Sequence, residues 1–249
     1  MTDEDEVPAG WPPVEDVTSK VVPLFPLRNL FLFPGTVVPL HIFEPRYRQM
    51  IEDSLDGPGR LVIGTIVEED EEGGTESTNG APAVHSVAGL GEIARHERMP
   101  DGRFVIMLVG LTRVRVRETT SNRLYRQVEI EPLEEVPVPE AEVEGLRAEL
   151  FEAVKARTPE LQELPGEMPV GHLTDLLLLR MQLPQSAMQP LYCELVIADR
   201  ARRALEEHHR RPIPVSEEGQ APDTLGLPGP PDATDSPSSG DADEPGSDA

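Results

Sequence analysis

The first part of the chain carries short apolar runs separated by turn residues, a pattern typical of β-strands. The runs are "VVPLFPL" (21–27), "TVVPLHIF" (36–43) and "RLVIGTIV" (60–67), and the sequence predicts a strand at each. Proline cannot donate a hydrogen bond to a neighbouring strand, so the first two runs belong at edges, ends or bulges of a sheet. Between them, "FPGT" predicts a turn in which Gly35 adopts a positive φ.

The apolar spacing becomes helical in "EPRYRQMIEDSL" (44–55). Pro45 is at a position that the first helical turn tolerates. Tyr47, Met50 and Ile51 recur at helical spacing, so we expect them on the inner face of one helix inserted among the strands.

Residues 90–131 show the clearest strand pattern. The turn "MPDG" separates "GEIARHER" from "RFVIMLVG", and Gly102 is expected to need a positive φ there. "LTRVRVRE" and "YRQVEIEPLEE" then alternate apolar and charged residues, which predicts a hairpin between 111–117 and 125–131. The outward positions would be Arg113, Arg115, Arg117, Glu129 and Glu131. Opposite charges facing each other across two strands contribute roughly 0.2–1 kcal/mol per pair.

After Pro139 the pattern is helical to the end of the apolar sequence. Helices are predicted within 140–157, 172–183 and 184–211, the last stretch holding one or two. The predicted fold class is therefore α+β, with about six strands and one inserted helix followed by a helical bundle.

Charge is distributed unevenly along the chain, whose net charge is −24. Residues 1–19, 68–76 and 212–249 hold six, six and nine acids and no base. We predict disordered acidic ends at 1–19 and 212–249, because such segments bury too little apolar surface to offset the entropy lost on ordering. The remaining boundaries are a β subdomain at 20–136 and a helical subdomain at 137–211.

Several classes of protein are disfavoured by the composition. Cys193 is the only cysteine, so no disulfide can form within the chain. The chain opens "MTDEDEVPAGW" without a leader, and no apolar run approaches the ~20 residues of a membrane helix. These features predict a soluble cytoplasmic bacterial protein that has no membrane partner.

Two blocks carry a resemblance to a known family. "PLFPLRNLFLFPGTVVPLHIFEPRYRQMI" closely resembles the opening of the Lon protease N-terminal domain, also called the Lon substrate-binding domain. "GLGEIARHERMPDGRFVIMLVGLTRVRV" is similar to the second signature of that family, and the helices around "LTDLLLLRMQLPQSAMQPLYCELVIADRARRALEEH" look like its C-terminal helices. The resemblance spans about residues 20–211. It implies a small PUA-like β-barrel followed by a helical bundle.

The catalytic parts of Lon proteases cannot be recognised in this sequence. An ATPase phosphate loop needs G-x-x-x-x-G-K-[ST], and a Ser–Lys peptidase needs a lysine of lowered pKa. The only lysines are Lys20 and Lys155, and neither lies in such a context. We therefore expect a stand-alone binding module without enzymatic activity and without a cofactor.

Histidines and arginines offer two alternative sites. The six histidines show no close ligand spacing except at the adjacent His208 and His209. Neighbouring residues of a helix point about 100° apart and rarely bind one ion together, so no metal is expected. The stripe of Arg113, Arg115 and Arg117 is compatible with a PUA-like RNA-associated protein, the alternative function. A solvated, partly neutralised barrel face is favoured instead, because the facing glutamates and the acidic ends compete with nucleic acid.

The leading hypothesis is a polypeptide-binding module that serves as an adaptor or regulator in protein quality control. Its expected partners are unfolded or extended polypeptide segments, together with a protease or chaperone, and no nucleic acid. Apolar or basic side chains that look exposed around the first turn are Arg28, Phe31, Phe33, Phe43, Arg46 and Tyr47. For this set, core packing and peptide contact are both open. The hypothesised peptide site comprises Phe31, Phe33, Pro34 and Arg46. A cryptic hydrolase ranks last, because no nucleophile–base pair can be recognised.

Overall fold

The computed structural model describes residues 21–68, 81–159 and 165–213. The predictions for residues 1–19, and for all of 212–249 beyond its first two residues, lie outside the described residues. The subdomain limits at 20–136 and 137–211 stay predictions.

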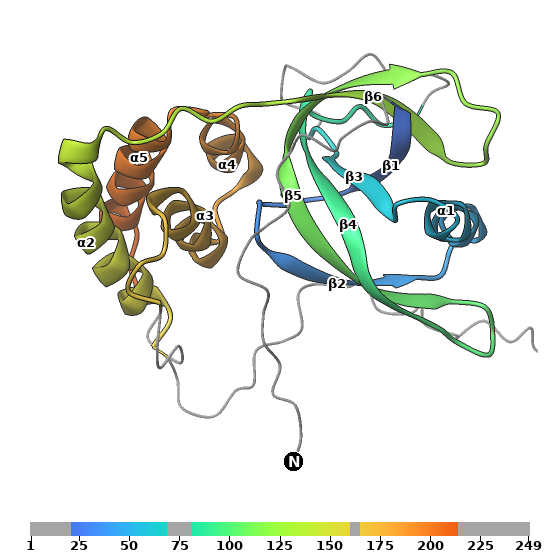
Figure 1. Ribbon diagram of the computed structural model, residues 1–249, viewed down its shortest axis with the longest axis horizontal. Coiled ribbons are helices and arrows are strands. Elements are labelled where there is room, and N and C mark those ends of the chain that lie inside the picture. Colours follow the sequence, from blue (N-terminus) through green and yellow to red (C-terminus); the bar gives the residue numbers. More distant parts are fainter. Residues whose placement is uncertain (1–20, 69–80, 160–164, 214–249) are drawn as a thin grey trace, which may run out of the picture. The chain divides into compact units, whose positions relative to one another are not determined.

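The described residues fold into a mixed sheet with one inserted helix, followed by four helices (Figure 1). The strands are β1 (Val21–Leu27), β2 (Val37–Ile42), β3 (Arg60–Thr65), β4 (Val87–Arg98), β5 (Phe104–Thr119) and β6 (Arg126–Pro132). The helices are α1 (Pro45–Leu55), α2 (Glu140–Arg157), α3 (Val170–Met181), α4 (Gln185–Tyr192) and α5 (Ile197–Arg210). The predicted α+β class and the predicted order of elements are confirmed.

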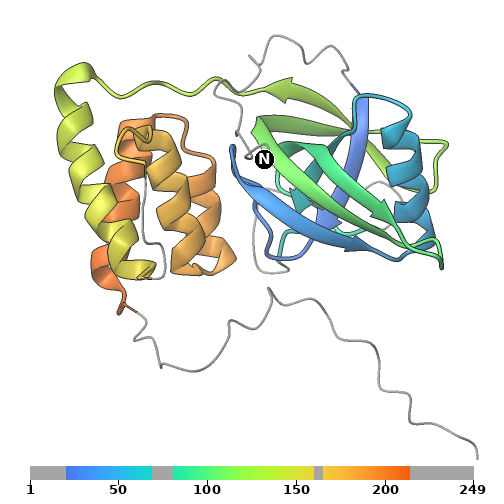
Figure 2. The same cartoon turned by 60° about the horizontal axis from the view of Figure 1, so that its bottom comes forward.

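The long strand β5 closes the sheet on itself. Neighbouring strands run in the order β2-β5-β4-β3-β1-β6, and β5 also pairs with β6. The first half of β5 pairs with β2 and its second half pairs with β6. Five strands therefore form a closed ring, and β2 extends it as an edge strand, seen in blue along the lower border of the sheet in Figure 2.

The strand prolines lie where the sheet tolerates a missing donor. Pro23 is in the part of β1 that pairs with β6, and Pro26 is in the part that pairs with β3. Each half of β1 thus has one neighbouring strand, and Pro39 lies in the edge strand β2. The prediction that these prolines mark edges and ends is confirmed.

Helix α1 packs its apolar face onto the barrel. Tyr47, Met50 and Ile51 are buried as predicted, and they belong to the same apolar cluster as Leu40 and Ile42 of β2. The turn glycines also behave as expected, since φ is 75° at Gly35 and 82° at Gly102.

The helices after β6 bury a second apolar core. Leu146, Leu150 and Val154 line the buried face of α2, and they recur at the helical spacing of the predicted helix at 140–157. Leu173 and Leu177 of α3 are fully buried in the same cluster. No helix in the described parts of the chain is long and apolar enough to cross a membrane.

Candidate functional site

Phe31 and Phe33 of the predicted peptide site are not exposed. They retain 7% and 0% of their accessible surface, and each ring centroid lies 5.1 Å from that of Tyr192 in α4. The Tyr192 hydroxyl donates a hydrogen bond of 2.7 Å to the Leu32 carbonyl, which ties the loop to α4. Of the two alternatives left open for this set, core packing holds for both phenylalanines, because the helices after β6 cover the loop that carries them.

Pro34 and Arg46, the other two predicted site residues, remain accessible. Pro34 is partly exposed, and Arg46 is exposed at the start of α1. The Arg46 guanidinium binds Glu44, with Nη2 and Oε2 2.8 Å apart, and lies 4.5 Å from the ring centroid of Tyr47. Pro34 directly follows a loop packed on the helical core, whereas Arg46 is on α1 beside the barrel core. The structure therefore does not gather the four predicted residues into one patch.

A different apolar surface is formed by β5 together with β2, the strand that lies between Pro34 and Arg46 in the sequence. Successive side chains of a strand point to opposite faces, so alternate residues of β2 share its outer face with alternate residues of β5. The register pairs Val37 with Val109, Pro39 with Met107 and His41 with Val105. Phe43 follows on the same side, with its ring centroid 6.4 Å from that of His41. We call this surface the β2–β5 outer face; it comprises Val37, Pro39, His41, Phe43, Val105, Met107 and Val109.

The β2–β5 outer face is exposed, and polar residues border it. Val37 and Phe43 retain 53% and 55% of their accessible surface. On the neighbouring strand β4, the exposed residues Arg95 and Glu97 lie opposite Met107 and Val105. An exposed apolar patch with a charged border is typical of a surface that binds protein chains. Phe43 had been recognised from the sequence as exposed-looking, but the alternation of β2 was the stronger signal for the whole face.

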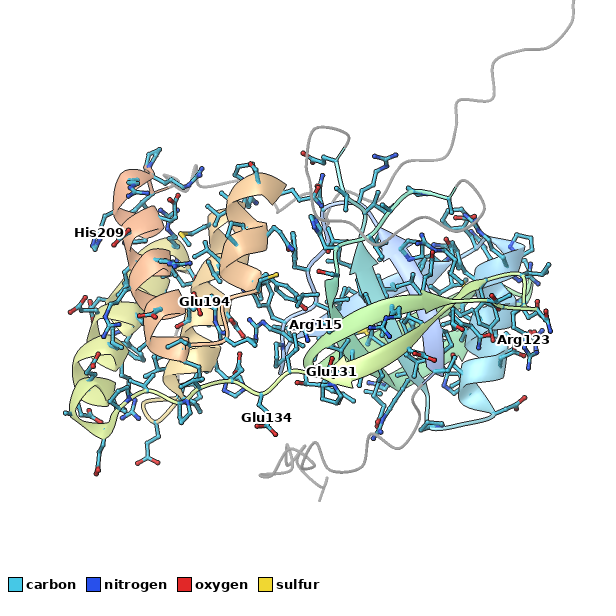
Figure 3. All side chains as sticks on the ribbon, turned by 90° about the horizontal axis from the view of Figure 1, so that it is seen from above. Arg115, Arg123, Glu131, Glu134, Glu194 and His209 are labelled. Carbon is cyan, nitrogen blue, oxygen red and sulfur yellow. The ribbon has the colours of Figure 1, made fainter. Side chains whose placement is uncertain are left out.

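The arginine stripe of β5 does not form a basic face. Arg113 points outward as predicted, yet its side chain is fully buried, because the helices cover that part of the strand. Arg115 pairs with Glu131 across the hairpin, with Nη1 and Oε2 3.2 Å apart. Both side chains are labelled in Figure 3. The prediction of a solvated stripe is therefore wrong for Arg113, and the predicted cross-strand pairing is confirmed for Arg115.

Arg113 belongs to a buried ion cluster that joins the barrel to the helices. Its Nη2 lies 2.7 Å from Asp175 Oδ1 in α3, and its Nη1 lies 2.7 Å from Glu135 Oε1. Arg200 of α5 contacts the same two carboxylates at 3.3 and 2.7 Å. Burial raises the pKa of Asp175, and the two guanidinium groups oppose that rise. We call Arg113, Glu135, Asp175 and Arg200 the buried ion cluster.

The histidines do not assemble a metal site in the parts of the chain that the structure describes. No group of three or more His, Cys, Asp or Glu side chains is placed there to hold an ion. His85 is buried, with its ring centroid 6.2 Å from that of Phe31, and His209 projects from α5 (Figure 3).

We expect His208 to make the free energy of unfolding dependent on pH. Arg157 Nε donates a 2.8 Å hydrogen bond to His208 Nδ1. Burial, followed by the charges of Arg157 and His209, lowers the pKa of His208 below its ordinary value of 6.5. Because the unfolded chain takes up this proton at a higher pH than the folded chain does, protonation favours unfolding. We expect the free energy of unfolding to fall as the pH drops through and below 6.5.

Chemical denaturation at a series of pH values measures this dependence. His208→Gln should flatten it, whereas His209→Gln, at the exposed neighbouring position, should leave it in place. Equal slopes for wild type and His208→Gln would contradict the assignment.

The chain is similar in sequence and in fold to parts of Lon proteases. The family described as "ATP-dependent protease La (LON) substrate-binding domain" matches residues 21–209. A Lon protease of Anaeromyxobacter dehalogenans is 28% identical over 221 residues, which cover 82% of this chain and 25% of that protein. Lon protease 2 of Sorangium cellulosum is 32% identical over 156 residues, which cover 63% of this chain and 19% of that protein. The chain thus spans at most about a quarter of the length of these relatives.

Two solved structures share the fold. The N-terminal domain of the Mycobacterium avium complex Lon protease superposes with a TM-score of 0.54 at 17% identity, covering 76% of this chain and 98% of that one. The Lon N-terminal domain protein from Xanthomonas campestris has a TM-score of 0.54 at 22% identity, with coverages of 75% and 97%. The fold of nearly the whole of each solved domain is therefore present in this chain.

Proposed function

Because the chain belongs to the Lon substrate-binding domain family, we propose that it is a non-enzymatic module that binds unfolded or extended polypeptide segments. The observation that carries the proposal is the exposed, apolar β2–β5 outer face, which can take up apolar side chains that a folded protein would hide. The predicted residues Pro34 and Arg46 precede and follow this face in the sequence, and we propose that they contact the ends of a bound segment.

We further propose a cytoplasmic role as an adaptor or regulator in protein quality control, with a protease or chaperone as partner. No phosphate loop and no suitably placed lysine occur in the 249 residues, so the proposed role involves neither ATP hydrolysis nor peptide cleavage. Binding to nucleic acid is not part of the proposal. In the arginine stripe of β5, Arg113 is buried and Arg115 is paired with Glu131.

Binding of an unfolded client should depend on the β2–β5 outer face. We expect Val37→Ser combined with Phe43→Ser to weaken binding about tenfold, because two apolar contacts are lost. Both side chains are more than half exposed, so the variant should fold. The measurement is fluorescence anisotropy of a labelled, reduced and alkylated protein that cannot refold. The wild-type affinity should be micromolar or weaker, since one small patch offers few buried anchors.

A matched control distinguishes binding at this face from non-specific binding to any exposed apolar side chain. Leu124 is 71% exposed and lies outside the face, in the connection between β5 and β6. Leu124→Ser should bind as wild type does. Equal loss of affinity in both variants, or tight binding of a structured RNA at moderate salt in place of the client, would refute the proposed function.

A further inference from the structure

The geometry points to a specific mode of binding: we propose that an extended polypeptide adds to the free edge of β2 as a further strand. The inference rests on the proposed function, since it concerns the same surface, and it commits to an extended client segment as the occupant. β2 is last in the strand order and pairs only with β5 among the strands of the described residues. Figure 2 shows it along the border of the sheet.

The hydrogen-bonding groups of β2 alternate between its two sides. The Gly110 N–H donates to the Thr36 carbonyl at 2.8 Å, which sets the pattern of the ladder. In an antiparallel pair, every second residue directs its N–H and C=O groups to the partner strand. Val38, Leu40 and Ile42 therefore bond to β5, and Val37, Pro39 and His41 direct their backbone groups to the free edge. Exposed groups of this kind form a template for another extended chain.

Pro39 makes this edge selective against a second copy of the same chain. It lies at an edge-directed position, so it removes one donor from the free edge and none from the ladder with β5. If two β2 edges paired with each other, two N–H donors would be missing from the new ladder. With a proline-free client, only the Pro39 donor would be missing. The edge thus resists self-association and still accepts a foreign strand.

Apolar surface lies on both sides of the place where the new strand would lie. Val37 and Phe43 stand on the outer face. On the inner side, Val38 of β2 is partly buried against the cluster that contains Leu40 and Ile42. Main-chain pairing supplies affinity without regard to sequence, and the apolar flanks favour uncharged segments. The inferred client is therefore an extended, apolar, proline-free stretch of an unfolded chain.

Backbone methylation of a peptide tests the mode of binding. The probe is a labelled peptide of about seven residues that alternates valine and threonine. One face of the bound strand then carries only valines, and a shift of one residue in register would exchange the two faces. One version is N-methylated at all inner valines, and the other is N-methylated at all inner threonines. Because only alternate N–H groups would bond to β2, we expect one version to lose about tenfold or more in affinity and the other to change little.

Two variants of the protein complement the peptides. Pro39→Val keeps an apolar side chain and restores the missing donor, so it should bind the unmethylated peptide several-fold more tightly. His41→Pro removes an edge donor while sparing the bonds to β5, and should bind it more weakly. Melting curves confirm that each variant is folded. If His41→Pro unfolds, the two methylated peptides and the Pro39→Val variant still test strand addition.

The outcomes distinguish the mode from the function. If both methylated peptides lose affinity equally and Pro39→Val shows no gain, strand addition is refuted while polypeptide binding stands. If the wild-type protein binds neither the unmethylated peptide nor an unfolded protein, the proposed function fails as well.

Discussion

We expect Asp175→Asn to lower the free energy of unfolding by about 3–5 kcal/mol, the range for removing one partner of a buried ion pair. Asp175 accepts from Arg113 Nη2 at 2.7 Å and lies 3.3 Å from Arg200 Nε. Both guanidinium groups are fully buried and always charged. Without the Asp175 carboxylate, Glu135 alone would balance two positive charges, so the loss is mainly the cost of an uncompensated buried charge. Asparagine has nearly the same shape, so packing should change little.

Glu131→Gln provides the control, since it makes the same chemical change on an exposed pair. Glu131 and Arg115 are more than half exposed, and such pairs are worth about 0–1 kcal/mol. Denaturant unfolding of both variants measures the contrast. Equal and small losses would show that the buried ion cluster does not hold the helices against the barrel.

The elements of this fold could be predicted because their patterns are local. The alternation of 111–117 with 125–131 gave the hairpin, and helical spacing gave the inner face of α1. Gly35 and Gly102 were identified because a tight turn requires a positive φ within a few residues of sequence. In each case the interactions that select the conformation lie within one element or one connection.

The errors arise where the helices cover the barrel. Arg113 has the same alternation as Arg115, and only the position of α3 and α5 separates a buried cluster from a solvated pair. Phe31 and Phe33 likewise lie next to a turn, and they become core because Tyr192 packs on them. Contacts between residues that lie 62 positions apart, as Arg113 and Asp175 do, or farther leave no local periodicity. The sequence therefore could not show that Phe31 and Phe33 are buried, and the peptide site stays a prediction.

We expect Gly110→Ala to lower the free energy of unfolding by about 3 kcal/mol, at the upper end of the usual range for overpacking. Gly110 lies inside β5, where a glycine normally weakens a strand. A Cβ there would overlap the Phe33 carbonyl oxygen and lie 2.9 Å from the Phe33 carbonyl carbon. The loop cannot move away freely, because the Gly35 N–H donates to the Gly110 carbonyl at 2.8 Å. The glycine thus lets the chain between β1 and β2 lie directly on β5.

Gly145→Ala is the matched control, with the opposite expected sign. Gly145 lies within α2, and a Cβ there would meet no atom within 4 Å. Alanine exceeds glycine in helix propensity, so this variant should gain about 0.5–1 kcal/mol. Denaturant midpoints of the two variants should therefore shift in opposite directions. A Gly110→Ala variant as stable as wild type would mean that the loop is not pinned.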